Sequence, residues 1–293
     1  MIERFLNYLA VEKRASSHTI LAYKTDLEQF SVFLTSFSFE TKLVQVSYPI
    51  VRSWLLSLMD ENIQARSINR KIATLKSFYK FLLREELISV NPMSKVRPLK
   101  VKKSLPNFVP EENMLRMLDH EDAFSADFEG RRDRMIFELL YGTGIRLSEL
   151  IQLASEEIDL YNSRIKVKGK GSKERLIPFN RTLLNEIKAY MAEKRKKFDN
   201  ESKYFLVNDK GRQLYPVFVY RKVQKYLALF TTLEKRSPHV LRHTYATHLV
   251  NKGAELKAVR DLLGHESLNA TQVYSHTTLD RLKEVFDQAH PKA

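Results

Sequence analysis

The sequence predicts a mainly α-helical protein with a small β-sheet, divided into two domains. The chain has 293 residues, of which 43% are hydrophobic, so it can fill more than one core. Apolar residues recur at helical spacing through most of its length, whereas a clear two-residue alternation appears near the middle. A segment that contains lysine and proline but few predicted elements separates a first group of helices from the rest.

The first domain is expected to contain four amphipathic helices. Apolar side chains keep helical spacing over residues 2–9 and, after a break at two serines, over residues 23–34. A third helix follows Pro49, and a fourth covers residues 67–84. We assign these helices to a small domain over residues 1–97.

A linker is predicted over residues 98–107. Asn91-Pro92 ends the helical block, and the stretch after it carries lysine and proline rather than an apolar pattern. The second domain then covers residues 108–293.

The second domain is expected to be mostly helical around a small sheet. Alternation predicts two strands, 164–168 and 175–179, which are joined by a turn with a lysine at its tip. A further short strand is predicted at 204–207. The predicted helices cover residues 111–118, 131–141, 147–151, 183–197 and 217–230, and nearly all of the chain beyond them.

Positive charge is concentrated in one part of the chain. The formal net charge is +14, and residues 64–103 carry eleven Lys and Arg against two Glu. Such a cluster suits a polyanion, because these side chains release counterions from a phosphate backbone. We therefore expect double-stranded DNA as a partner; a merely solvated basic surface is the alternative. The expected contacts are Arg66, Arg70, Lys71, Lys76 and Lys80 in the fourth helix, and Lys100, Lys102 and Lys103 in the linker.

The composition excludes several classes of site. The chain has no cysteine, which excludes disulfides, cysteine-ligated metals and thiol nucleophiles. No apolar run approaches the roughly 18 residues of a membrane span, and the charged N-terminal pattern is unlike a signal peptide, so a cytoplasmic location is expected. The phosphate-binding motif Gly-x-x-x-x-Gly-Lys-Ser/Thr does not occur in the sequence, so ATP-dependent chemistry is not expected. We predict no cofactor.

A metal site is not expected either. His239 and His243 are four residues apart, as in zinc-binding His-Glu-x-x-His helices, but Val240 takes the place of the glutamate. A two-metal nuclease would need clustered carboxylates. Three acidic residues of the second domain are instead expected to be helix-surface charges: Asp133, Glu138 and Glu149.

A phosphate-binding helix is predicted near the C-terminus. Ser237, followed by a proline, is expected to be the N-cap, so that free backbone N–H groups lie beside His239. Arg242 lies one turn later on the same face and could contact the same phosphate. His265 and the phenol of Tyr274 follow from later helices. The pattern favours phosphoryl transfer with a tyrosine nucleophile.

Two further residues would complete such a site. Arg146 lies where a Gly-x-Gly turn enters a helix, and its guanidinium could hold two non-bridging oxygens. Lys170 lies between two glycines and could protonate the leaving sugar oxygen, with Lys168 and Lys173 as close alternatives. A surface ion pair for the arginine and a solvated turn for the lysine are the simpler interpretations.

These residues lie in motifs that resemble the tyrosine recombinase (integrase) family, and most of all its Xer-type members. The motifs are GTGIRLSEL at residues 142–150, GKGSKER at 169–175, SPHVLRHTYATHL at 237–249 and LGH at 263–265, followed by Tyr274. The similarity spans nearly the whole chain. Six positions match the active-site residues of the family in order and spacing: Arg146, Lys170, His239, Arg242, His265 and Tyr274.

The resemblance implies a metal- and ATP-independent mechanism. Tyr274 would attack the scissile phosphate to form a 3′-phosphotyrosine and a free 5′-hydroxyl. A 5′-hydroxyl of the partner duplex would reverse the step and exchange strands through a Holliday junction. The other five residues would hold the phosphate oxygens (Arg146 and Arg242), protonate the 5′-oxygen (Lys170), assist proton transfer (His239) and support the transition state (His265).

The resemblance also implies an architecture. Residues 1–97 would form a SAM-like core-binding domain and residues 108–293 the catalytic domain, which together make a C-shaped clamp on DNA. A homo- or heterotetramer would hold two duplexes, with a DNA translocase as a possible activator. The C-terminal helix would pass to a neighbouring protomer, or pack on its own domain, through an apolar stripe of Leu279, Leu282, Val285 and Phe286.

The expected role is resolution of chromosome dimers at a short paired-arm site, which would link the protein to chromosome partition, cell division and the nucleoid. Three alternatives share parts of the evidence. An integrase or invertase of a mobile element would carry the same motifs. A type IB topoisomerase-like enzyme would use the same site to relax supercoils as a monomer. A non-catalytic DNA-binding protein would keep the basic surface but would not need all six residues.

Overall fold

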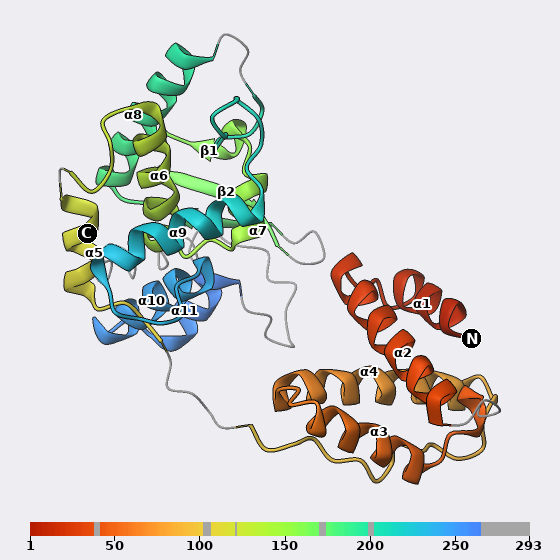
Figure 1. The fold of residues 1–293 in the computed structure, drawn as a ribbon. Helices are drawn as coiled ribbons and strands as arrows, with labels where there is room; N and C mark the ends of the chain where they lie inside the picture. The colour runs from red at the N-terminus through yellow and green to blue at the C-terminus, as the bar shows by residue number, and fades with distance from the viewer. Residues whose placement is uncertain (38–41, 102–106, 121, 170–173, 199–201, 265–293) are drawn as a thin grey trace. The chain divides into compact units, whose positions relative to one another are not determined.

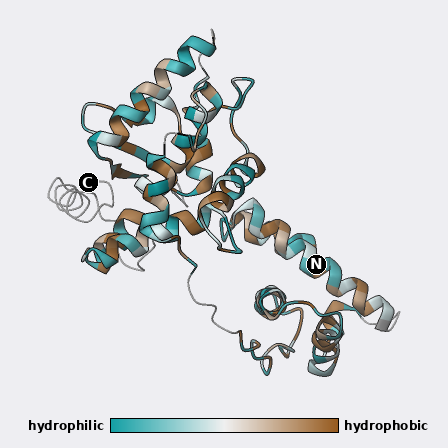
Figure 2. Ribbon diagram, turned by 60° about the vertical axis from the view of Figure 1, so that its left-hand side comes forward, coloured by the Kyte–Doolittle hydropathy of each residue, from teal (hydrophilic) through white to brown (hydrophobic). Residues whose placement is uncertain are grey.

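The computed structural model describes residues 1–37, 42–101, 107–120, 122–169, 174–198 and 202–264. The chain divides into two compact units, Met1–Ser104 and Leu105–Ala293, and each is described by itself (Figure 1). Helices with one hydrophilic and one hydrophobic face make up most of both units (Figure 2). The predicted fold class, mainly α with a small sheet, is confirmed. No helix among the described residues is both long and apolar enough to cross a membrane.

The N-terminal unit contains the four predicted helices around one core. Ser16 caps the second helix by accepting a hydrogen bond from the backbone of Thr19 at 3.2 Å, and a proline opens the third. Aromatic rings fill the centre, where the centroids of Phe30 and Trp54 are 4.7 Å apart. The helices are α1 (Ile2–Val11), α2 (Ser17–Phe37), α3 (Tyr48–Asp60) and α4 (Ala65–Arg84), with a 3₁₀ turn at Leu43–Gln45.

A buried carboxylate joins α2 to α4. Asp26 is completely buried and accepts hydrogen bonds from Lys71 Nζ at 2.9 Å, from Thr74 Oγ1 at 2.9 Å and from the guanidinium of Arg70. Lys71 is itself buried and also donates to Gln29. The prediction that Lys71 lies at the surface as a DNA contact is therefore wrong. Its ammonium neutralises Asp26, because a buried charge is stable only when it is paired.

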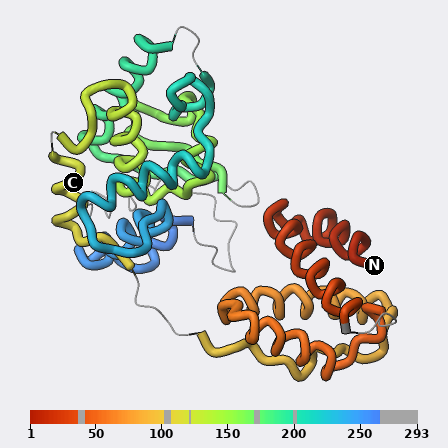
Figure 3. The backbone as a smooth tube through the Cα atoms, viewed as in Figure 1, coloured from red at the N-terminus to blue at the C-terminus, as the bar shows by residue number. Residues whose placement is uncertain are grey.

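The described part of the C-terminal unit contains seven helices and a small sheet. Helix α6 runs through its centre and is buried along most of its length. Helices α10 and α11 lie side by side, and α10 also packs on α6 (Figures 1 and 3). The helices are α5 (Glu111–Asp119), α6 (Phe128–Thr143), α7 (Leu147–Gln152), α8 (Arg181–Lys197), α9 (Pro216–Phe230), α10 (Pro238–Asn251) and α11 (Leu256–Leu263).

The sheet is antiparallel, in the order β1-β2-β3. Strands β2 (Arg164–Lys168) and β3 (Glu174–Pro178) form the predicted hairpin, with Ile165 opposite Ile177. Strand β1 (Ile158–Asp159) was not predicted, because two residues are too few to show an alternation. The register places Lys168 opposite Glu174 at one end of this strand pair.

The predicted strand at 204–207 is wrong. Only isolated bridges occur there, between Ala154 and Tyr204 and between Val207 and Gln213. Phe205, Leu206 and Val207 are all buried, so the apolar run reflects burial on every side rather than a pleated strand. Periodicity alone does not separate these two cases.

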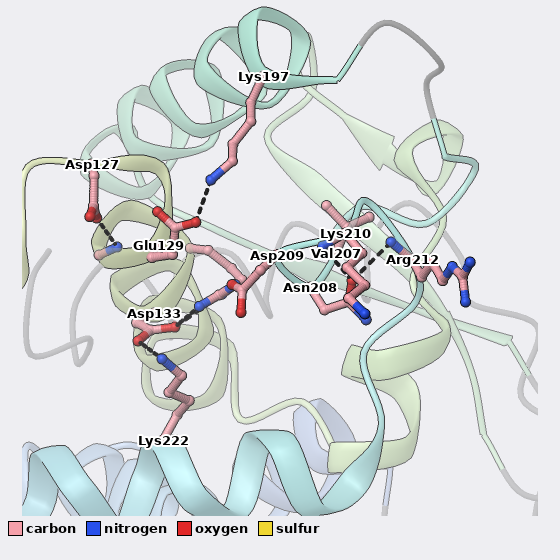
Figure 4. Close-up of polar contacts among 12 residues, drawn as sticks. Asp127, Glu129, Asp133, Lys197, Val207, Asn208, Asp209, Lys210, Arg212 and Lys222 are labelled. Atoms are coloured by element: carbon pink, nitrogen blue, oxygen red, sulfur yellow. Dashed lines mark hydrogen bonds and ion pairs between the residues drawn. The ribbon is translucent and has the colours of Figure 1, made fainter.

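A second group of buried charges ties α6 to α9. Arg132 is completely buried, and its Nη2 lies 2.8 Å from Asp133, while its Nη1 pairs with Asp209 in the turn after residue 207. Asp133 also accepts from Lys222 of α9 at 2.7 Å (Figure 4). Tyr226, on the same helix, donates to Asp133 at 3.1 Å. The prediction that Asp133 is a helix-surface charge is wrong, because its carboxylate is needed to neutralise buried and half-buried cations. Glu138, which was also predicted to be a helix-surface charge, is buried as well.

Candidate active site

The structure describes three of the six predicted catalytic residues. Arg146 is the N-cap of α7, while His239 and Arg242 lie in the first two turns of α10. These segments are about a hundred residues apart in the sequence, but α10 packs on α6, which ends just before Arg146. The other three residues, Lys170, His265 and Tyr274, lie outside the described residues.

The start of α10 forms as the sequence predicts. Ser237 is the N-cap, and its hydroxyl accepts from the backbone N–H of Val240. His239 is exposed on the first turn, beside backbone N–H groups that have no partner inside the helix. Partial burial and the positive charge of Arg242 lower the pKa of His239, so its neutral, proton-accepting form is favoured near pH 7.

Arg242 is directed inward from α10. Its side chain is 6% exposed, and its guanidinium donates to the backbone carbonyls of Gly144 and Leu263. Burial, together with the positive charges of Arg146 and Arg175, lowers the pKa of Arg242 to about 10. The side chain therefore stays charged at neutral pH while it lies close to two like charges, an arrangement that favours the binding of an anion.

Arg146 is the more accessible of the two predicted clamp residues. Its side chain is 35% exposed, and Nη2 donates to the carbonyl of Gly264 at 2.7 Å. Nη1 donates to Glu149 Oε1 at 2.8 Å, and the backbone N–H of Arg146 donates to Glu149 Oε2 at 2.8 Å. Glu149 thereby caps α7 and orients the guanidinium at the same time.

Gly144, two residues before Arg146, is required both by its backbone conformation and by close packing. Gly144 adopts a left-handed conformation with φ of 61° and ends α6. A Cβ atom there would lie 2.5 Å from the ring of Tyr245 in α10, which is closer than atoms can pack. Only glycine satisfies both conditions, so the turn allows α10 to approach and brings Arg242 to Arg146.

Two residues of the site were not predicted in this role. Glu149 was expected at the helix surface, yet it is buried and bound by Arg175 of β3, with Nη1 to Oε1 at 2.6 Å and Nη2 to Oε2 at 2.9 Å. Burial by itself would raise the pKa of Glu149, but hydrogen bonds and charge from Arg175 and Arg146 lower it to about 2. The prediction of a surface charge is wrong, because the carboxylate is needed between two guanidinium groups.

The sequence contains a signal for Arg175. Arg175, Ile177 and Phe179 are spaced two residues apart, so their side chains point to the same face of the strand. A charged side chain therefore lies on the buried face of the hairpin. A buried arginine needs partners for its charge, most often an acidic side chain. The pairing with Glu149, 26 residues earlier, could not be deduced from that pattern.

The C-terminal end of α11 is bound by three arginines. The carbonyl of Leu262 accepts from Arg175 Nε at 3.2 Å, that of Leu263 accepts from Arg242, and that of Gly264 accepts from Arg146. The last carbonyls of a helix have no partner within the helix and lie at its negative end, so they suit cations. These three bonds fix the backbone immediately before His265 in the sequence.

The predicted DNA contacts of the first unit and its linker have different surroundings. Arg66, Lys80 and Lys100 are exposed, and Lys76 is half-buried. Arg70 is exposed, but its guanidinium pairs with Asp26. Lys102 and Lys103 lie outside the described residues.

The geometry supplies a compact cationic site with a neutral histidine beside it. Two guanidinium groups could hold the non-bridging oxygens of a phosphodiester, and His239 could accept a proton. Among the residues that the structure describes, no group of three His, Asp or Glu side chains is placed to hold a metal ion.

Comparisons with known proteins identify the family of the chain. A family model described as "Phage integrase family" matches residues 107–281, and one described as "Phage integrase, N-terminal SAM-like domain" matches residues 2–86. The chain is 39% identical to a tyrosine recombinase XerC of Chlorobaculum parvum, over 100% of this chain and 94% of the relative. It is 38% identical to a tyrosine recombinase XerC of Oceanobacillus iheyensis, over 100% of this chain and 96% of the relative.

Solved structures show the same fold. A crystal structure of the XerH site-specific recombinase bound to a palindromic difH substrate, in a post-cleavage complex, has a TM-score of 0.71 at 21% identity and covers 97% of this chain and 93% of that one. A λ integrase dimer bound to a COC′ core site has a TM-score of 0.68 at 17% identity, over 93% of this chain and 97% of that one. With both domain models matched and full-length relatives near 39% identity, the chain belongs to the phage integrase family of tyrosine recombinases.

Proposed function

We propose that this protein cuts and rejoins double-stranded DNA at a specific site, with Tyr274 as the nucleophile. The observation that carries the proposal is the convergence of Arg146 and Arg242 at the end of α11, beside His239. Two guanidinium groups at one point can neutralise the charge that develops on the non-bridging oxygens of a phosphodiester. Family membership supplies the reaction class.

The proposed reaction conserves the energy of the phosphodiester bond. The Tyr274 oxygen forms a bond to phosphorus as the bond to the 5′-oxygen breaks, which gives a 3′-phosphotyrosine and a 5′-hydroxyl. His239 accepts the phenol proton, and Lys170 donates a proton to the leaving oxygen. Attack by a 5′-hydroxyl from the partner duplex reverses the step. ATP is not required in this scheme, because each broken bond is replaced by an equivalent one. A metal ion is not required either, because the guanidinium groups neutralise the phosphate charge.

DNA binding is proposed to use exposed cations of both units. The net charge of +14 supports a polyanion partner. In the first unit and its linker, Arg70 would share its charge with Asp26, and the other proposed contacts are Arg66, Lys76, Lys80, Lys100, Lys102 and Lys103. Lys71 is buried against Asp26 and is not a proposed contact.

The biological role that we propose is resolution of chromosome dimers. The full-length relatives named XerC support an Xer-type role over that of a mobile-element integrase or invertase. Four protomers would hold two duplexes in the nucleoid and exchange their C-terminal helices, and a DNA translocase would activate them. A topoisomerase-like enzyme, by contrast, would relax DNA as a monomer.

A suicide substrate tests the proposal. A nicked duplex that carries the protein's own site, selected from genomic fragments, should trap a covalent protein–DNA complex with the parent protein. Tyr274→Phe should bind the same duplex and form none. A covalent complex that persists in this variant would exclude Tyr274 as the nucleophile, and relaxation of supercoiled DNA that lacks the site would favour the topoisomerase alternative.

A further inference from the structure

We propose that Arg175 on β3 is a positioning residue of this site, which acts through Glu149 and the end of α11 to hold Arg146 where it meets the phosphate. The inference rests on the proposed function, because it concerns how the phosphate clamp of that reaction is held.

Arg175 is placed to support other residues rather than to touch DNA. Its side chain is 5% exposed, and all three guanidinium nitrogens donate to protein acceptors. Two of them form a parallel pair of bonds to both oxygens of Glu149. This fork geometry fixes the plane of the carboxylate, which a lysine could not do.

The fixed carboxylate sets the position of Arg146. Glu149 binds both the backbone N–H and the Nη1 of Arg146 at 2.8 Å, so any rotation of the carboxylate moves the guanidinium. Arg175 also balances the negative charge of Glu149. Without Arg175, Glu149 would keep only its hydrogen bonds to Arg146, and its negative charge would oppose the charge that develops on the phosphate in the transition state.

The third bond of Arg175 connects the same network to α11. Its Nε donates to the carbonyl of Leu262, and its side chain passes against Gly264, whose Cβ would lie 3.1 Å from Arg175 Cδ. Gly264 has φ of 63° and ends α11. One buried side chain therefore joins the hairpin, the cap of α7 and the turn that leads to His265.

Single-turnover cleavage of the suicide substrate tests this role, with protein in excess over DNA. Arg175→Gln should slow formation of the covalent complex about 100-fold, the loss expected when a clamp group is misplaced by about 1 Å. Arg175→Lys, which keeps the charge but lacks the fork, should recover only part of the rate. DNA binding in a gel-shift assay should stay close to that of the parent protein.

The matched control is Arg164→Gln on the neighbouring strand. Arg164 on β2 also forms an ion pair, with Nε at 3.0 Å from Asp159, but its side chain is 38% exposed and its partner is not Glu149. Its replacement should leave the cleavage rate unchanged. A double variant, Glu149→Gln with Arg175→Gln, should be no slower than the slower single variant, because both act on one group.

A second measurement does not depend on cleavage. In the parent protein, the bonds to Glu149 and Gly264 should restrict rotation of the Arg146 guanidinium and give separate side-chain ¹⁵N NMR signals, which should merge in Arg175→Gln. If that variant does not fold, Arg175→Lys provides the same comparison.

The outcomes separate the two proposals. A parent protein that forms the covalent complex, together with an Arg175→Gln variant that is equally fast, would overturn the positioning role and leave the function standing. A parent protein that forms no complex with its site would overturn the function instead. In that case, unchanged Arg146 signals in the variant would overturn the positioning role, and merged signals would support it.

Discussion

Two buried carboxylates, one in each unit, have opposite consequences. Asp26 of α2 and Glu149 of α7 are both buried, and each is bound by two basic side chains. Around Asp26, the cations come from α4 alone and hold two helices together. Around Glu149, guanidinium groups from α7 and β3 meet a third from α10, and all three also bind the end of α11.

The difference lies in how charge is balanced. At the Glu149 site, burial and the like charges of Arg146 and Arg175 together lower the pKa of Arg242 to about 10. That cluster keeps excess positive charge at a partly exposed point, at a cost in stability that an incoming phosphate would relieve. The Asp26 cluster contains a hydroxyl and a buried lysine, and it joins elements of the fold. The two clusters thus differ in what they gather: the Asp26 cluster joins two helices, whereas the Glu149 cluster brings three guanidinium groups to one helix end.

The largest effect is expected at the structural cluster. Asp26→Ala should destabilise the N-terminal unit by about 3–5 kcal/mol, because Lys71 would be left buried without a counter-charge. Urea denaturation would measure the loss. If the protein loses little stability, Asp26 does not hold α2 to α4, and the contrast with Glu149 fails.

The next effect distinguishes function from stability. Arg242→Gln should slow formation of the covalent complex by about 10²–10³-fold, since one group that stabilises the transition state is removed. The melting temperature should not fall, because two repulsive charge pairs disappear with the guanidinium. Calorimetry and suicide-substrate cleavage of the same preparation test both halves. A large fall in melting temperature at normal activity would reverse the roles assigned to the two clusters.

The pH dependence of stability provides a third test. The pKa of Glu149 is about 2 against an ordinary value of 4.5, so its contribution is complete above about pH 4.5 and is lost as the pH falls toward 2. At pH 7 the free energy of unfolding of Glu149→Gln should therefore be lower than that of the parent protein by up to about 3 kcal/mol. This difference in free energy should narrow below pH 4.5. Urea denaturation from pH 3 to 7 would measure it.

The control for that experiment is Glu174→Gln. Glu174 pairs with Lys166 at 2.8 Å, but both side chains are more than 40% exposed, so the pair should contribute little. A gap for Glu149→Gln that stays constant with pH would show that packing, rather than charge, accounts for its effect.

The smallest effect is expected at the exposed cations. Arg66→Gln should weaken DNA binding and reduce the slope of log affinity against log salt by about one, while cleavage at saturating DNA stays normal. Lys188→Gln, an exposed change on α8, is the control. Equal slopes for Arg66→Gln and the parent protein would remove Arg66 from the DNA-contacting surface.

Local patterns account for what the sequence predicted correctly. The helices around Phe5, Trp54 and Phe78, the β2–β3 hairpin and the capped start of α10 all follow from spacing and from single residues such as Ser237. The incorrect predictions share one cause. Lys71 and Glu149 were assigned to the surface because the partners that bury their charges, Asp26 and Arg175, lie far away in the sequence. The segment 204–207 is likewise buried by distant parts of the chain, without a neighbouring strand.

The sequence by itself therefore determined the two helical domains, the motif residues Arg146, His239 and Arg242, and the membership in a family that its motifs resemble. Only the tertiary structure decided that Glu149 and Arg175 belong to the site and that three arginines share the carbonyls of residues 262–264. The physical reason is the distance along the chain over which each effect acts. Spacing and caps act over a few residues, whereas the neutralisation of a buried charge depends on side chains that only the folded chain brings together.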